Sequence, residues 1–201
     1  MLDLIIKNGA CYIDKELKDQ DIGVKDGKII KIGKIEEETK EIFDAKGLTV
    51  LPGCIDTQTH FREPGSTDTE DLHSGSRAAI AGGITSVFEM PNTNPPTSNK
   101  KEFQRKLDLA KNRMYCNYAF YFGATADNAK ELADLKNLEG CCGIKLFAGS
   151  STGNLLVADE KDIETVFQNS SKVVAVHSED EEILNMNKKL IRDDDVHSHP
   201  I

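Results

Sequence analysis

Polar side chains able to bind ions and small polar molecules recur near the ends of short apolar segments in this sequence. They are His60, Arg62, Asn92, Lys145 and His177. Imidazole is a common ligand of zinc, guanidinium binds carboxylates in a two-pronged fork, and a side-chain amide both donates and accepts hydrogen bonds. Residues of these types are suited to holding a polar substrate, provided that the fold brings them together.

Spacing within the chain favours such a meeting. Side chains two residues apart on a strand point to the same side, so Gln58, His60 and Arg62 are predicted to line one pocket. Other interpretations stay open for three residues. Arg62 is also able to form an ion pair with a neighbouring carboxylate, Asn92 lies in a proline-rich turn, and Lys145 is long enough to extend to solvent.

Apolar runs with strand character alternate with segments of helical periodicity from residue 49 onward. Strands are predicted at 49–56, 84–90, 116–122, 143–147 and 172–177, and helices at 71–81, 100–111, 128–138, 160–168 and 179–190. Five alternations are typical of βα units on a parallel sheet, whose carboxyl strand ends form an active-site rim. The sheet is either open and doubly wound or part of an eight-stranded barrel.

The first 50 residues instead predict a small β module. Asn8–Gly9 and Asp26–Gly27 are turn signals, the second within a β-hairpin. We therefore expect two domains: an N-terminal β-sandwich module over 1–50 and a barrel part over 51–201. A whole (β/α)8 barrel takes about 250 residues, so the chain is expected to stop after five βα units, before closure.

Composition limits the classes of function. The 201 residues include 25 Lys and Arg against 34 Asp and Glu, giving a formal net charge of −9. This acidic balance argues against nucleic-acid binding, and no apolar run is long enough to span a membrane. A cytoplasmic protein is predicted, with its five cysteines as buried apolar residues. His73 is expected to be a solvated or helix-capping residue, and His197 and His199 are expected to be exposed.

The motifs themselves resemble those of one family. Residues 56–65, with His60 followed by Arg62-Glu63-Pro64-Gly65, resemble the D-x-H-x-H-x-R-x-P-G signature of dihydroorotases within the amidohydrolase superfamily. Residues 90–95 resemble the M-P-N-T-x-P of the same family, 143–147 its lysine-bearing strand, and 176–179 its strand-five metal histidine. The resemblance extends along the whole chain and includes the β module, and it implies a partial TIM-type barrel of the amidohydrolase type.

The resemblance implies a zinc-dependent hydrolase that interconverts dihydroorotate and N-carbamoyl-L-aspartate in pyrimidine biosynthesis. One or two zinc ions would be held by His60, His177 and Lys145, the last carboxylated to an anionic bridge, with zinc activating water. Arg62 and Asn92 would bind the small-molecule substrate. The general-base aspartate of the family is expected beyond Ile201, so the 201 residues alone are expected to be incomplete for catalysis.

One residue departs from the family pattern. Gln58 occupies the place of the first histidine of the His-x-His motif, and a neutral amide oxygen is a weaker zinc ligand. Two alternatives therefore stay open: a hydantoinase-like or allantoinase-like cyclic amidase, and a non-catalytic homologue that acts as a structural partner. A homo-oligomer is also expected to be possible, because unclosed strands invite association.

Overall fold

The computed structural model describes residues 1–149 and 154–188. The chain divides into two compact units, Met1–Gly53 and a second unit that begins at Cys54. The single strand predicted over 49–56 is wrong, because Pro52 and Gly53 divide it. Thr49–Val50 pairs within the first unit, while Cys54–Thr59 begins the second.

The first unit consists of two small sheets. The four-stranded sheet has the order β5-β4-β1-β6, from β1 (Leu2–Lys7), β4 (Asp21–Lys25), β5 (Lys28–Gly33) and β6 (Thr39–Asp44). The three-stranded sheet has the order β3-β2-β7, from β2 (Ala10–Ile13), β3 (Glu16–Asp19) and β7 (Thr49–Val50). The buried apolar cluster of the first sheet is small and consists of Leu2, Ile5 and Ile35.

Turn chemistry explains the hairpins. Asp26 and Gly27, between β4 and β5, both have positive φ, 49° and 71°, as a type I′ turn requires, and this confirms the predicted hairpin. Asn8 has a φ of 62° too, but the strands on either side of Asn8 and Gly9 belong to different sheets. That turn signal therefore marks a change of sheet rather than a hairpin.

The second unit contains a curled parallel sheet of five strands, as predicted for a partial barrel. Its order is β12-β11-β10-β9-β8, from β8 (Cys54–Thr59), β9 (Ile84–Glu89), β10 (Asn117–Gly123), β11 (Cys141–Phe147) and β12 (Val174–His177). Every neighbouring pair is parallel, and order in space follows order in the chain. The carboxyl ends of all five strands consequently lie along the same edge of the sheet.

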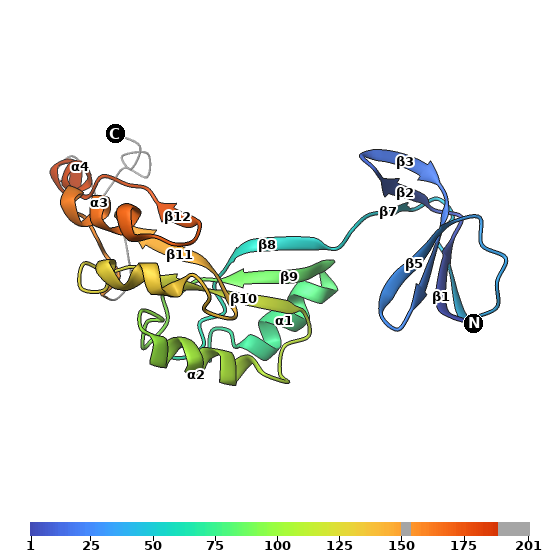
Figure 1. Ribbon diagram of the computed structural model, residues 1–201, viewed down its shortest axis with the longest axis horizontal. Helices are drawn as coiled ribbons and strands as arrows, with labels where there is room; N and C mark the ends of the chain where they lie inside the picture. The colour runs from blue at the N-terminus through green and yellow to red at the C-terminus, as the bar shows by residue number, and fades with distance from the viewer. Residues whose placement is uncertain (150–153, 189–201) are drawn as a thin grey trace, which may run out of the picture. The chain divides into compact units, whose positions relative to one another are not determined.

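Helices connect the strands. They are α1 (Leu72–Ala81), α2 (Lys100–Ala110), α3 (Glu160–Asn169) and α4 (Glu181–Asn187). Asp71, Asn99, Asp159 and Asp180 cap their first turns through side-chain hydrogen bonds. Figure 1 shows α1 and α2 side by side below β9 and β10, where they cover one face of the sheet.

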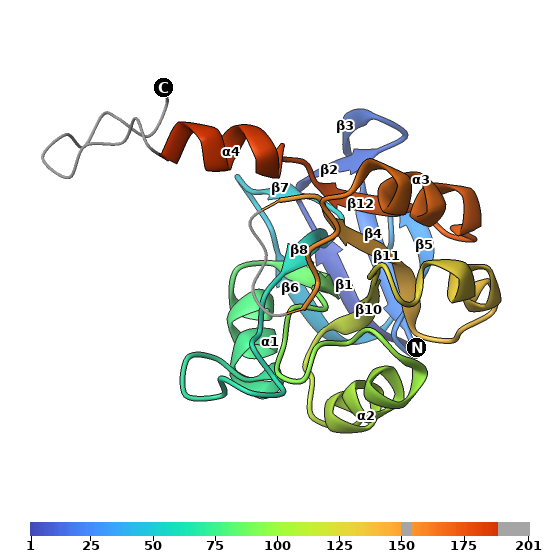
Figure 2. The same ribbon diagram turned by 90° about the vertical axis from the view of Figure 1, so that its left-hand side faces the viewer.

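The α-helix predicted over 128–138 is a 3₁₀ helix, η1 (Ala129–Leu135). Asn128 does not cap it, because its Oδ1 accepts from the backbone N–H of Thr125 at 2.9 Å, while its Nδ2 donates to the carbonyls of Ser98 and Gly123 at 2.8 and 2.9 Å. Buried Leu132 and Leu135 still attach η1 to the core, and η1 packs against α3 (Figure 2).

The main hydrophobic core lies between the parallel sheet and its helices. Phe103 and Ala110 of α2 pack there with Phe120 and Phe122 of β10, as the helical spacing predicts. The cysteines fit the prediction only in part: all five are free thiols, but Cys54 is exposed. Among the described residues, no helix has the length and apolar character needed to cross a membrane.

Gly75 of α1 provides a test of this packing. A Cβ at this position would overlap the ring of buried Phe61, whereas a Cβ on Gly82 would meet its nearest neighbour, the Ala79 carbonyl oxygen, at 3.5 Å. We predict that Gly75→Ala lowers the free energy of unfolding by about 1–3 kcal/mol through overpacking. Gly82→Ala, the matched control, should change it by less than about 0.5 kcal/mol. Urea denaturation measures both, and equal effects would refute this account of the α1 contact.

Candidate active site

The predicted site residues lie along the carboxyl edge of the parallel sheet. His60 directly follows the end of β8, Asn92 lies three residues beyond β9, and Lys145 is near the end of β11. His177 is the last residue of β12. The topology therefore places four of the predicted residues at the rim where parallel α/β proteins bind their ligands.

His60 and Asn92 form the polar link between β8 and β9. The Nδ1 atom of His60 lies 2.9 Å from Oδ1 of Asn92. Because an amide oxygen only accepts, Nδ1 carries the proton and Nε2 keeps its lone pair, which is the arrangement of a metal-binding histidine. Burial lowers the pKa of His60, as do the positive charges of Arg62 and Lys145. At neutral pH the imidazole is thus held in its neutral form.

Lys145 is a buried amine, with only 2% of its surface exposed, so it does not extend to solvent. Its Nζ lies 5.0 Å from the centre of the Phe147 ring. Across the described residues we find no ion pair or hydrogen bond from this ammonium group. Burial lowers the pKa of Lys145 and so increases the fraction of neutral amine.

His177 lies next to the same aromatic ring. Its imidazole stacks on Phe147 with ring centres 6.1 Å apart, and its Nε2 is 2.8 Å from a carboxylate oxygen of Glu179. A carboxylate in this position fixes the proton on Nε2 and leaves Nδ1 as the nitrogen with a lone pair. Phe147 thus has Lys145 and His177 as neighbours.

Gln58 is exposed, and β8 ends at Thr59, one residue before His60. The prediction that strand alternation continues from Gln58 to Arg62 is therefore wrong. Arg62 has a φ of 59°, in the left-handed region that non-glycine residues rarely adopt. The chain turns sharply at Arg62, and this turn directs the guanidinium away from the strand path.

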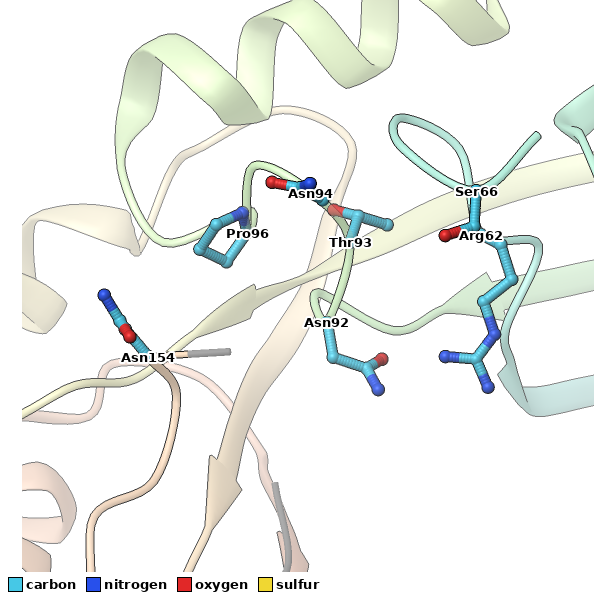
Figure 3. Close-up of a pocket in the computed structure, with 7 residues that line it drawn as sticks. All are labelled: Arg62, Ser66, Asn92, Thr93, Asn94, Pro96 and Asn154. Atoms are coloured by element: carbon cyan, nitrogen blue, oxygen red, sulfur yellow. The ribbon is translucent and has the colours of Figure 1, made fainter. Parts of the chain in front are cut away.

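Arg62 and Asn92 line a pocket of about 530 Å³. Thr93, Asn94 and Pro96, from the same motif as Asn92, also line it, together with Ser66 and Asn154, which the sequence did not single out. Figure 3 shows the Arg62 guanidinium and the Asn92 amide extending from neighbouring loops to the same side. The described lining residues include one cation, several hydrogen-bonding groups and no carboxylate, so the pocket is suited to an anionic ligand.

A half-buried ion pair supports the turn at Arg62. Glu63 receives a two-pronged contact from Arg113, with N–O distances of 2.8 and 3.2 Å, and also accepts a hydrogen bond from the backbone N–H of Leu72. The ion pair between Arg62 and a neighbouring carboxylate, an alternative left open by the sequence, does not form with Glu63, whose partner is Arg113, 50 residues away in the chain. Nothing in the local sequence signals this partner.

His60, His177 and Lys145 are suited to binding a metal if Lys145 is carboxylated. Within residues 1–149 and 154–188 no three His, Cys, Asp or Glu side chains form a group able to hold an ion. His60 and His177 offer one imidazole nitrogen each, and the buried, unpaired amine of Lys145 becomes an anionic ligand if it is carboxylated. His73 is neither fully solvated nor the cap of α1, which is Asp71; it is half-buried, with its Nε2 3.3 Å from the Tyr115 hydroxyl. His197 and His199 lie outside the described residues.

Comparisons with known proteins show the family of the chain. Residues 49–192 match the model of the amidohydrolase family. The chain is 36% identical over 206 residues to a dihydroorotase of Methanosarcina mazei and 38% identical over 162 residues to an allantoinase of Escherichia coli. These alignments cover 98% and 80% of this chain, but 45% and 36% of the relatives.

Solved structures give the same fold. L-hydantoinase (dihydropyrimidinase) of Arthrobacter aurescens superposes with a TM-score of 0.86 at 29% identity, over 94% of this chain and 43% of that protein. A D-hydantoinase superposes with a TM-score of 0.77 at 30% identity, over 94% and 42% of the two chains. This chain therefore spans less than half the length of each of these relatives. Through the match that covers most of its length, the chain belongs to the amidohydrolase family.

Proposed function

We propose that the protein is a metal-dependent cyclic amidase whose preferred substrate is dihydroorotate, which it interconverts with N-carbamoyl-L-aspartate. The observation that carries the proposal is the pairing of a cationic pocket around Arg62 with the His60–Asn92 link at the same strand ends. A ring that bears a carboxylate matches such a pocket better than an uncharged ring does. The dihydroorotase relative is consistent with this choice.

We assign the residues as follows. Arg62 binds the substrate carboxylate in a fork, and Asn92 contributes a further hydrogen bond while its Oδ1 holds His60. His60, His177 and carboxylated Lys145 would hold zinc, with exposed Gln58 as at most a weak ligand. Zinc supplies Lewis acidity that polarises an amide carbonyl and makes water a nucleophile at neutral pH. No residue of this chain is assigned as the general base.

Carboxylation of Lys145 follows from its surroundings. Only a neutral amine attacks CO₂, and burial of this lysine favours the neutral form. The product is an anion, whose charge suits a metal ion and relieves the burial of an unpaired ammonium group. His60, whose pKa is lowered in part by Lys145, would then face a negative rather than a positive neighbour.

A second candidate is a hydantoinase or allantoinase, favoured by the solved hydantoinase structures and the allantoinase relative. Hydantoin and allantoin lack the carboxylate that dihydroorotate carries on its ring. Arg62, the proposed partner of that carboxylate, is therefore the residue that discriminates between the two candidates. A third, a non-catalytic homologue, rests on Gln58 in place of a histidine. With the first candidate we also propose a role in pyrimidine biosynthesis, a cytoplasmic localisation and a homo-oligomeric state.

The substrate assignment is tested by Arg62→Gln in the native enzyme. Losing a charge-assisted hydrogen bond should raise KM for dihydroorotate about 10- to 100-fold, because the carboxylate loses its partner. The KM for dihydrouracil, the same ring without the carboxylate, should stay unchanged. Steady-state kinetics on both substrates decides between them, with Arg105→Gln, at an exposed position of α2, as control. Equal losses on both rings would exclude carboxylate binding by Arg62, and turnover of hydantoin or allantoin alone would support the second candidate.

The metal assignment is tested by Lys145→Gln. Glutamine cannot be carboxylated, so we expect the zinc content of the purified enzyme to fall to background. Carbon-13 NMR after growth with labelled bicarbonate should give a carbamate signal in the wild-type enzyme and none in the variant. Lys130→Gln, an exposed lysine, serves as control. Full zinc content in Lys145→Gln would remove this lysine from the metal site.

A further inference from the structure

A buried ion pair lies beneath the candidate site, and neither of its residues is assigned to the substrate or the metal. Glu89 is the last residue of β9, Lys106 belongs to α2, and their side chains are 1% and 0% exposed. The Nζ of Lys106 forms an ion pair with the Glu89 carboxylate and lies 5.2 Å from the centre of the Phe120 ring. The contact therefore joins the sheet to its covering helix inside the apolar core.

Stability alone does not account for this pair. Burial raises the pKa of Glu89 and lowers that of Lys106, since it disfavours both charges. Replacing a buried ion pair by apolar side chains of similar volume often leaves a protein equally stable or more stable. Helical spacing also predicts an apolar residue at position 106, next to Phe103 and Ala110 on the buried face. A charged pair at this place needs another reason.

The pair holds the backbone from which the site residues project. Lys106 Nζ donates to the carbonyl oxygen of Met90 at 2.9 Å, and the N–H of Met90 donates to Thr59 at 2.9 Å. Thr59 is the register partner of Glu89 and directly precedes His60. The hydrogen bonds at Met90 and Thr59 thus fix the ends of β9 and β8, beyond which Asn92 and His60 lie.

We propose that Glu89 and Lys106 are positioning residues that set the end of β9, so that Asn92 meets His60 on one side and the pocket on the other. The proposal deepens the proposed function and rests on it, because Asn92 is assigned there to the substrate. Neither side chain touches the pocket. Their effect passes through the Met90 carbonyl, and a displacement of about 1 Å at such a support can lower turnover by roughly 100-fold.

The test is the double variant Glu89→Leu with Lys106→Met in the native enzyme, since either change alone leaves a buried group without its counter-charge. Circular dichroism and thermal unfolding establish that the variant folds. Nitrogen-15 NMR of labelled histidines, with His60 assigned through His60→Gln, reads whether Nδ1 of His60 still carries its proton. Kinetics on dihydroorotate gives KM and kcat, with Lys101→Met, at an exposed position of α2, as the matched control.

We expect a folded double variant in which His60 loses its fixed Nδ1–H form and kcat/KM falls by about 100-fold, while Lys101→Met changes neither. A folded variant with an unchanged His60 signal and wild-type kinetics overturns the proposal. If the wild-type enzyme turns over no cyclic amide, the proposed function fails, but the His60 signal still decides the positioning role. If the first variant does not fold, the double variant Glu89→Gln with Lys106→Met replaces it, because it keeps the side-chain volume without the charges. The His60 signal and the kinetics of that variant are then interpreted in the same way.

Discussion

The hydrogen bond between His60 Nδ1 and Asn92 Oδ1 is the interaction on which the rest of the site depends. It forms only because β8 and β9 run parallel and end together, with Met90 bonded to Thr59 across the strand ends. It fixes one nitrogen of the imidazole as a donor and leaves the other with its lone pair, which we propose binds a metal. It also places the amide of Asn92 beside Arg62 on the pocket wall.

Two ion pairs, one half-buried and one fully buried, support this link from outside the pocket. Arg113 holds Glu63, which follows Arg62 and accepts from Leu72 at the start of α1. Lys106 holds Glu89 and the Met90 carbonyl at the end of β9. Arg62 is the charged residue among the described lining of the pocket. The carboxylates of Glu63 and Glu89 lie outside the pocket lining, where they do not compete with an anionic ligand.

Much of this arrangement could be predicted from the sequence, because it depends on local patterns. The alternating apolar runs predicted the parallel strands, and Asp26–Gly27 predicted a hairpin. The order of strands and helices predicted the edge of the sheet at which His60, Asn92, Lys145 and His177 lie. Partners distant in the chain could not be predicted. Arg113, in the turn after α2, and Lys106, within α2, have no local sequence signal for their partners Glu63 and Glu89. The sharp turn at Arg62 ends the alternation from Gln58, and the side chain of Asn128 bonds to Ser98 and Gly123, 30 and 5 residues away in the chain.

The central claim is that His60, His177 and Lys145 share a metal ion. Anomalous X-ray diffraction at the zinc absorption edge, on crystals of the native enzyme, tests it most directly. The account predicts an anomalous peak about 2.0–2.1 Å from an imidazole nitrogen of His60 or His177, with a carbamate on Lys145 in contact with the same ion or bridging to a second one. A peak far from all three side chains, or a fully loaded site with Lys145 unmodified and pointing away, would contradict it.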